Sequence, residues 1–264
     1  MAKIERYKKA ELVEYCKTIG LDTEGKGKDV LMEEATEYGN NEIRQAIKDG
    51  TGYKLLTSKM EVLAKEYADN LNSKIEARKE EMKADDNSHY LIYRVLGITT
   101  TEGQLIDEYQ NTGRFLYKYA GSFLEEAASL CLKFNNIDGG KTLIKNNQGQ
   151  RPKTFEIDFL DGNNAIEIKW RDATTDGDHI TKEHTRVKAI ESYGHIPIRV
   201  MFYYPQRAQA KRIQETLKTI YIGVKGQYYG GEEAWEFIKN YSGFDLKEIL
   251  TKIADKRTPE NGGK

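Results

Sequence analysis

The chain has 264 residues, enough for one large domain or for a core domain with a smaller appendage. Its 42 acidic residues nearly balance 41 basic ones, so the net charge is −1 and the overall composition does not indicate a polyanionic partner. A nucleic-acid enzyme with this balance must concentrate its basic residues on one face. Cys16 and Cys131 lie far apart, and the apolar runs are shorter than a membrane span or a secretion leader, so we expect reduced thiols, no membrane association and a cytoplasmic protein.

Two helices are predicted near the N-terminus, joined by a loop rich in Gly and Lys. Apolar residues recur at helical spacing over residues 10–19, Gly20 ends that pattern, and a second helix begins at about Asp29. The run KKAELVEYCKTIGLDTEGKGKDVLMEEA resembles the helix–loop–helix of SAP-type DNA-binding modules. Lys26 and Lys28 of the loop would then contact phosphates, although a plain helical hairpin with solvated lysines explains the same pattern.

A third helical pattern runs over residues 58–83, where charged residues are dense. One apolar stripe follows it at helical spacing, formed by Met60, Leu63, Tyr67, Leu71 and Ile75. We interpret the stripe as core or as a dimer seam. The polar run at residues 85–88 marks a domain boundary, so residues 1–86 are expected to form a helical N-terminal region that contacts DNA or mediates dimerisation.

The sequence GSFLEEAASLCLKF, which starts at Gly121, predicts a buried helix. Its expected core face is formed by Leu124, Ala127, Ala128 and Cys131. Glu125 lies beside that face, and such a carboxylate needs a partner or a metal because unpaired burial is costly. Glu126 is the competing candidate, and an ion pair with Lys118 or Lys133 would also account for a glutamate here.

Residues 154–170 read TFEIDFLDGNNAIEIKW and predict a β-hairpin, preceded by a short strand over residues 141–145. Two runs that alternate apolar and charged residues flank the turn sequence DGNN. Strict alternation places Phe159 on the same side as Ile157, and Leu160 on the same side as Asp158. In the second strand Glu167 and Lys169 share a face, so we expect the side chains of Asp158, Glu167 and Lys169 to converge.

Two carboxylates and one amine at the same point of a hairpin suit phosphodiester chemistry. Asp158 and Glu167 offer the oxygen ligands that a hard cation such as Mg²⁺ prefers, and the cation would polarise a phosphoryl oxygen. Lys169 could position or deprotonate the attacking water and offset the charge on phosphorus. The alternative is an amphipathic surface hairpin with a Glu–Lys pair, because charged alternation is common on solvated sheets.

Asp158, followed after a turn by Glu167-Ile168-Lys169, resembles the motif of the PD-(D/E)XK nuclease superfamily, and within it the type II restriction endonucleases. Ile157 stands where this motif often has proline, a departure that is frequent in the superfamily. The runs IEIKWRDATTDGDHITKEHTRVKAI and IPIRVMFYYP are similar to sequences that follow the core in the ApaLI-like group. The resemblance implies that Asp158 and Glu167 ligate the metal, that Glu125 assists them from the preceding helix, and that Lys169 positions or activates the water.

Residues 171–188 are unusually polar for a segment that follows a core strand, and functional residues tend to lie in such segments. A helix is predicted from about Thr181, with Val187 and Ile190 turned inward. Along one side of it we expect His179, Lys182, Glu183 and Arg186. His179, Lys182 and Arg186 are the candidates for contacts with base edges, while a solvated helix face explains the pattern equally well.

The C-terminal third predicts a buried central strand over residues 196–204 and an amphipathic helix over residues 206–221, with Ala208 and Ile220 among its inward residues. Basic residues outnumber acidic ones locally; they are Arg199, Arg207, Lys211, Arg212, Lys218 and Lys225. Arg207, Lys211 and Arg212 are the candidates for contacts with the DNA backbone. A turn is expected at residues 228–231, a helix over residues 235–253 and a disordered tail at residues 257–264.

The predicted fold is α/β: a PD-(D/E)XK restriction-endonuclease-like core at residues 87–256, with a mixed β-sheet flanked by helices, follows a helical N-terminal region at residues 1–86. The resemblance implies a type II restriction endonuclease that uses Mg²⁺ to hydrolyse phosphodiester bonds in double-stranded DNA at a specific site. It also implies functional pairing with a DNA methyltransferase. Symmetry of the cut site predicts a homodimer. The alternatives are a structure-directed repair or junction-resolving nuclease of the same superfamily and a non-catalytic DNA-binding protein.

Overall fold

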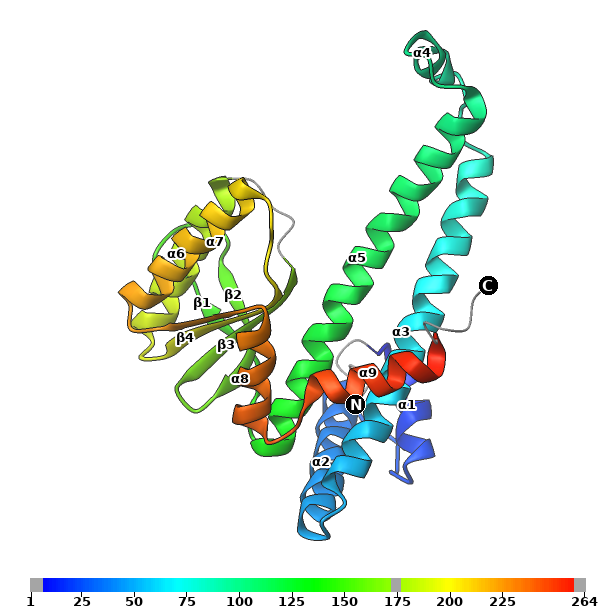
Figure 1. The fold of residues 1–264 in the computed structure, drawn as a ribbon. Coiled ribbons are helices and arrows are strands. Elements are labelled where there is room, and N and C mark those ends of the chain that lie inside the picture. The colour runs from blue at the N-terminus through cyan, green and yellow to red at the C-terminus, as the bar shows by residue number, and fades with distance from the viewer. Residues whose placement is uncertain (1–6, 172–176, 259–264) are drawn as a thin grey trace. The chain divides into compact units, whose positions relative to one another are not determined.

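The computed structural model describes residues 7–171 and 177–258, without the side chains of residues 177–179 (Figure 1). Internal contacts divide the chain into two compact units, Met1–Glu61 with Glu125–Lys264, and Val62–Leu124. The predicted boundary at residues 85–88 lies inside the second unit, so the proposed division into residues 1–86 and 87–256 remains a prediction. Arg257, at the start of the predicted tail, still belongs to a helix, and residues 259–264 lie outside the described residues.

The predicted N-terminal pair of helices is present as α1 (Lys9–Thr18) and α2 (Lys28–Lys48). The two helices enclose a small core formed by Leu12, Cys16, Leu31 and Ala35. Lys26 of the connecting loop pairs with Glu34 at 2.8 Å, so its ammonium group is engaged within the chain. Cys16 and Cys131 are both buried free thiols.

The second unit consists of α4 (Tyr90–Val95) and most of the long helices α3 (Gly52–Lys83) and α5 (Thr100–Asn135). These two helices are antiparallel, because Tyr67 contacts Tyr119 and Phe123 while Arg78 donates to Asn111. Tyr67 of the predicted apolar stripe therefore packs within the helix pair. Within the described residues, no helix combines the length and apolar composition needed to cross a bilayer.

One five-stranded sheet forms the centre of the first unit. Its strands are β1 (Gly140–Lys145), β2 (Thr154–Asp161), β3 (Asn164–Arg171), β4 (Ile196–Tyr203) and β5 (Gln227–Gly230). They lie in sequence order, and β1–β2 and β2–β3 are antiparallel while β3–β4 and β4–β5 are parallel. The predicted hairpin is confirmed, and Gly162 in its turn has φ of 54°. This mixed sheet confirms the predicted fold class.

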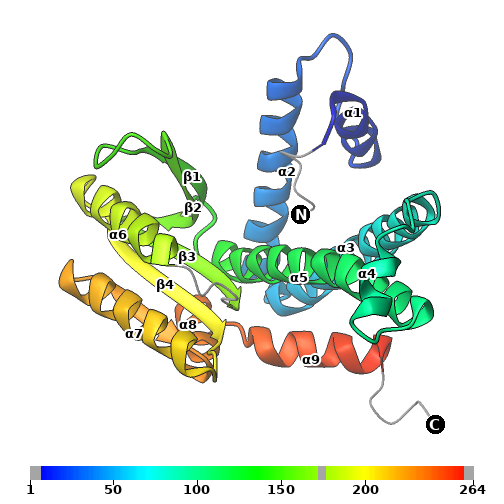
Figure 2. The ribbon, with the colours of Figure 1, turned by 90° about the horizontal axis from the view of Figure 1, so that it is seen from above.

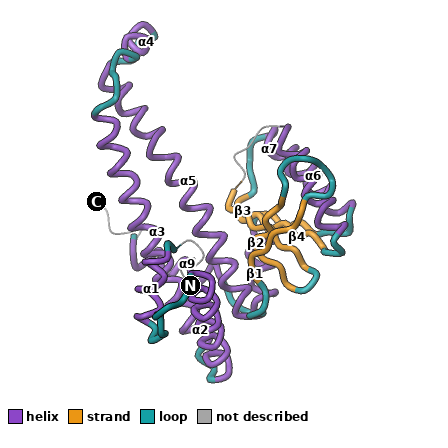
Figure 3. The backbone as a smooth tube through the Cα atoms, turned by 180° about the vertical axis from the view of Figure 1, so that it is seen from behind, coloured by secondary structure: helices purple, strands orange, loops and turns teal. Residues whose placement is uncertain are grey.

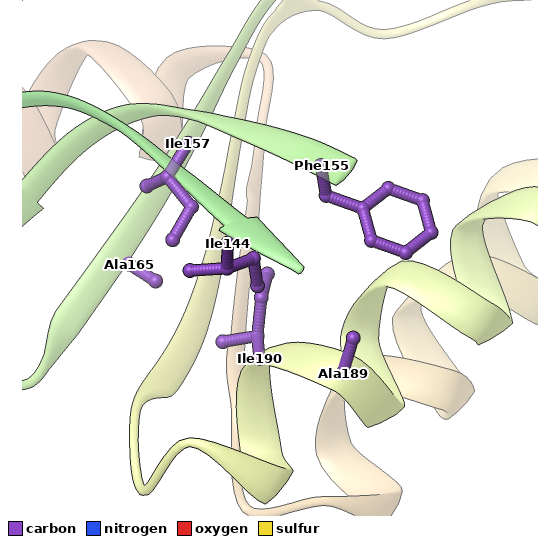
Figure 4. Packing of buried hydrophobic residues seen from close by; sticks show 6 residues of the cluster. All are labelled: Ile144, Phe155, Ile157, Ala165, Ala189 and Ile190. Atoms are coloured by element: carbon purple, nitrogen blue, oxygen red, sulfur yellow. The ribbon is translucent and has the colours of Figure 1, made fainter. Parts of the chain in front are cut away.

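Helices α6 (Gly177–Ser192) and α7 (Ala208–Gly223) connect the parallel strands and lie side by side on one face of the sheet (Figures 2 and 3). Ala189 and Ile190 of α6 pack against the sheet, in a cluster completed by Ile144, Phe155, Ile157 and Ala165 (Figure 4). Helix α8 (Glu232–Ser242) packs on β4 through Trp235 and Phe202, and α9 (Leu246–Arg257) follows it.

Helices α3 and α5 begin earlier than expected, at Gly52 and at Thr100, and further elements also differ from the sequence-based expectation. Helix α6 begins at Gly177 rather than near Thr181, and α7 turns Ala210 and Tyr221 inward while Ala208 is exposed. The expected turn at residues 228–231 is largely the edge strand β5. The expected helix at residues 235–253 is broken at Gly243, whose φ of 79° suits glycine and ends α8.

The strict alternation expected in β2 is wrong beyond Asp158. Thr142 of β1 pairs with Ile157 of β2, and Gly140 of β1 pairs with Leu160 of β2. Two steps along β1 thus correspond to three steps along β2. The extra residue is a β-bulge, and it returns Leu160 to the face of Phe155 and Ile157, where it packs. The side chain of Phe159 instead lies close to Gly139, where an added Cβ would come within 2.6 Å of its ring.

Candidate active site

Asp158 lies at the point where the hairpin ladder between β2 and β3 ends. The paired residues run from Asp161 and Asn164 to Phe159 and Ile166. The Ile168 N–H donates to Asp158 Oδ2 at 2.8 Å, so a side chain of β2 serves as the acceptor for this amide. The bulge and this hydrogen bond together fix the carboxylate of Asp158, which is only 6% exposed.

Glu167 and Lys169 lie on one face of β3, as predicted. The Lys169 ammonium pairs with the Glu167 carboxylate and lies 3.7 Å from Asp158 Oδ2. A second cation, the guanidinium of Arg186 from α6, also pairs with Glu167. The structure therefore brings Asp158, Glu167 and Lys169 together, and the buried Glu167 is held between two cations.

Glu125 reaches the same region from the C-terminal part of α5. Carboxylate oxygens of Glu125, Glu156 and Asp158 lie within 4.8 Å of one another, which is an arrangement of hard oxygen donors that can hold a divalent cation. Lys141 of β1 pairs with Glu125 at 3.0 Å and with Glu156 at 2.6 Å. Glu156 and Lys141 were not among the sequence candidates for the site.

Burial and the neighbouring charges shift the pKa values of Asp158, Glu167 and Lys169 in different directions. Burial and the neighbouring charge of Glu167 raise the pKa of Asp158 to about 7. Burial also disfavours ionised Glu167, but Lys169 and Arg186 outweigh it and lower the pKa of Glu167 to about 2. For Lys169, burial is outweighed by Glu167 and Asp158, which raise its pKa above the usual value. The site thus holds a carboxylate at Glu167, an ammonium at Lys169 and a carboxyl group at Asp158 that titrates near neutrality.

Comparison with protein families decides which class of protein carries this site. The family described as ApaLI-like restriction endonuclease matches residues 32–255. The chain belongs to this family. Comparison with curated proteins and with solved structures gives no match. The site on β2 and β3 is thus the candidate active site of an ApaLI-like restriction endonuclease, and the family's activity makes the chain a nuclease.

Behind the site of this ApaLI-like chain lies a buried ionic network. Glu183 of α6 is 4% exposed and accepts hydrogen bonds from Arg199 at 3.2 Å and from the Tyr221 hydroxyl at 2.6 Å. Arg186 lies 3.9 Å from Glu183 and joins this network to Glu167. Arg199 is fully buried, so this member of the local excess of basic residues cannot contact a DNA backbone.

The predicted DNA-contacting residues fall into two groups. Exposed side chains are those of Lys182 on α6 and of Arg207, Lys211 and Arg212 at the start of α7. Glu183 and Arg186 share one side of α6, where Arg186 faces the site, whereas Lys182 is exposed, so the expected common side is formed only in part. His179 lies in the first turn of α6, and its side chain is outside the described residues.

Proposed function

We propose that the chain is a type II restriction endonuclease that hydrolyses phosphodiester bonds of double-stranded DNA at a specific site in the presence of Mg²⁺. The observation that carries this proposal is the convergence of Asp158, Glu167 and Lys169 on one hairpin of an ApaLI-like family member. Glu125 supports it, because its carboxylate joins that of Asp158 across two elements.

The residues at the site fit a hard divalent cation. Asp158, Glu167 and Glu125 are the proposed ligands. Carboxylate oxygens of Asp158, Glu125 and Glu156 form one group, whereas Glu167 pairs with Lys169 and Arg186 and is not a member of that group. Bound Mg²⁺ would polarise a phosphoryl oxygen and lower the pKa of a water molecule. Lys141 pairs with two of these carboxylates, so it lowers the local negative charge before a cation binds.

The chain's own residues would position the reacting groups. Lys169 is one-third exposed and protonated, so it can donate a hydrogen bond to the attacking water and to a phosphoryl oxygen. Arg186 holds Glu167 ionised and fixes its orientation. We further propose that Lys182, Arg207, Lys211, Arg212 and His179 contact DNA, that the enzyme is a cytoplasmic homodimer, and that a DNA methyltransferase protects the host DNA.

The test is digestion of a long DNA of known sequence by the purified protein, with Mg²⁺ and with EDTA. Discrete bands that require Mg²⁺ are the expected result, and mapping their ends gives the site and the stagger. Asp158→Ala should abolish cleavage while retaining DNA binding in Ca²⁺, whereas Asp138→Asn, which changes an exposed loop carboxylate, should cut as the wild type does. A smear would favour a structure-directed nuclease, and uncut DNA would favour a binding protein.

A further inference from the structure

The short helix α4 presents an apolar face to solvent. This face, called the α4 apolar face below, is formed by Leu91, Ile92, Val95 and Leu96, which are 62%, 59%, 73% and 71% exposed. Single exposed apolar residues are ordinary, but three on one side of a six-residue helix, together with Leu96 at its C-cap, form a contiguous patch of the kind that marks an interaction site. The active site does not account for it, because all the residues of that site belong to the other compact unit.

Helix α4 is fixed to α5, so its apolar face is not a disordered loop that could fold inward. Tyr90 and Tyr93 lie against Gly103 of α5, where an added Cβ would come within 2.6 Å of the Tyr93 ring. Asp107 accepts a hydrogen bond from the Tyr93 hydroxyl at 3.0 Å and pairs with His89 at 3.0 Å. These contacts hold one side of α4 on α5 and leave the opposite side facing outward.

A shallow hollow of about 360 Å³ lies next to α4, in the turn that leads into α5 and on the first turns of that helix. It is lined by Gly97, Ile98, Glu102, Leu105, Ile106 and Tyr109. Of these, Leu105, Ile106 and Tyr109 are 47%, 50% and 71% exposed. The same end of the unit thus carries a projecting apolar face and an apolar hollow.

The helix that carries the α4 apolar face and the hollow also bear opposite charges. Arg94 is an exposed cation on α4, whereas the exposed anion Glu102 lines the hollow. In an isologous contact, the α4 apolar face of each subunit meets the hollow of the other, so each Arg94 approaches the other subunit's Glu102. The seven large apolar side chains would supply much of the roughly 800 Å² per partner that a stable interface needs.

We propose that a second copy of the chain covers the α4 apolar face, with the α4 helix of each subunit seated in the hollow of the other. Self-association is favoured over another partner because the face, the hollow and both charges are present on the same surface. This inference rests on the homodimer of the proposed function and deepens it, since it assigns the surface through which the two copies meet to the unit Val62–Leu124, which holds none of the active-site residues.

Sedimentation equilibrium of the full chain, without DNA or metal, tests this interface. The wild type is expected at twice the 30.3 kDa chain mass. Val95→Lys and Ile106→Lys should each raise the dimer dissociation constant at least about 30-fold, because each buries an amine in an apolar contact. Ile222→Lys is the matched control, since it changes an apolar side chain of α7 that is 58% exposed and should leave the dimer intact.

Disulfide trapping gives a second measurement that does not depend on affinity. Val95→Cys protein mixed with Ile106→Cys protein should form a disulfide-linked dimer under mild oxidation, because the two native thiols are buried. Ile222→Cys protein mixed with Ile106→Cys protein should not form such a disulfide-linked dimer. A monomeric wild type, or a dimer that Val95→Lys leaves unchanged and that Val95→Cys does not trap, would overturn the proposal. Asp158→Ala should dimerise normally, which separates this result from any result on cleavage.

Discussion

Asp158 is a carboxyl group whose ionisation opposes folding. Its pKa is about 7 in the fold against an ordinary value of 3.8, so the unfolded chain binds fewer protons than the fold between these values. Stability is therefore lost as the pH rises through this window. The pKa of Glu167 is lowered to about 2, so ionised Glu167 stabilises the fold. This stabilisation is lost only as the pH falls from the ordinary pKa of a glutamate, 4.5, to about 2.

We predict that Asp158→Asn raises the free energy of unfolding by about 2 kcal/mol above pH 7. The gain should shrink as the pH falls and disappear near the ordinary pKa of the carboxyl group. Urea unfolding in EDTA at a series of pH values measures it. Asp138→Asn is the control, because that side chain is 89% exposed and should show no such dependence. A variant less stable than the wild type above pH 7 would contradict the assigned cost of ionisation.

Glu183 compensates a guanidinium that has no access to water. We predict that Glu183→Gln lowers the free energy of unfolding by about 3 kcal/mol, because the buried Arg199 then loses the charge of the carboxylate that accepts its hydrogen bond. Tyr221→Phe, which removes one hydrogen bond to the same carboxylate, should cost about 1 kcal/mol. Denaturant unfolding measures both.

The matched control for this network is Glu191→Gln on the same helix. Glu191 is exposed and pairs with Lys188 at the surface, so the change should stay within about 0.5 kcal/mol. Equal effects of Glu183→Gln and Glu191→Gln would show that the buried network does not stabilise the fold.

At this scale, sequence reasoning found residues whose proximity follows from one hairpin. Asp158, Glu167 and Lys169 converge because a turn and an alternation fix their places. Glu156 shares the face of Asp158 because it precedes it by two residues in the strand, yet its membership of the carboxylate group depends on α5 and could not be derived. The pairing of Arg199 with Glu183 joins a strand to a helix, and no local pattern distinguishes a buried arginine from an exposed one.

Helix α4 packs on α5 at Gly103, so adding one methyl group there should disturb the packing of the two helices. In Gly103→Ala the new Cβ would lie 2.6 Å from Tyr93 Cδ2 and 3.0 Å from Tyr90 Cδ1. These ring atoms are close to the backbone of α4 and cannot move away freely, so the short helix must shift. We predict about tenfold faster tryptic cleavage after Arg94 in native protein.

Gly113→Ala is the control on the same helix. No atom lies within 4 Å of the Cβ it would add, so it should gain about 1 kcal/mol of helix propensity without exposing α4. Similar cleavage rates in the two variants would show that α4 is not held by its contact at Gly103.

Among the elements, the hairpin, the strands β1 and β4 and parts of the long helices were predicted, whereas β5, the short helix α4 and the break between α8 and α9 were not. Strand β5 has four residues and two tyrosines before a glycine, too short a run for alternation to register. The break at Gly243 lies inside a continuous helical pattern: Gly243 ends α8 with a positive φ, and the Asp245 side chain begins α9 by accepting a hydrogen bond from the Glu248 N–H. The bulge in β2 is likewise invisible to a rule that counts alternate residues.

For the whole molecule, near-zero net charge requires that DNA binding come from a local surface. We predict that replacing Arg207, Lys211 and Arg212 by Ala makes the dependence on salt less steep. A plot of the logarithm of the DNA-binding constant against the logarithm of the salt concentration should have a negative slope that is smaller in magnitude by about 2 to 3. Titrations of the Asp158→Ala protein in Ca²⁺ measure it. Lys65→Ala, which removes an exposed lysine of α3, is the control and should leave the slope unchanged. An unchanged slope in the triple variant would place the phosphate contacts elsewhere.

The first compact unit is discontinuous in sequence, since Val62–Leu124 separates its two parts. During synthesis, the N-terminal 61 residues leave the ribosome long before the strands that complete their unit. Closing the intervening segment as a flexible loop would cost entropy. Because α3 and α5 pack antiparallel, the two ends of the segment Val62–Leu124 lie close to each other. We therefore expect this helix pair to form early and to act as a template that lets the sheet assemble on residues made much earlier.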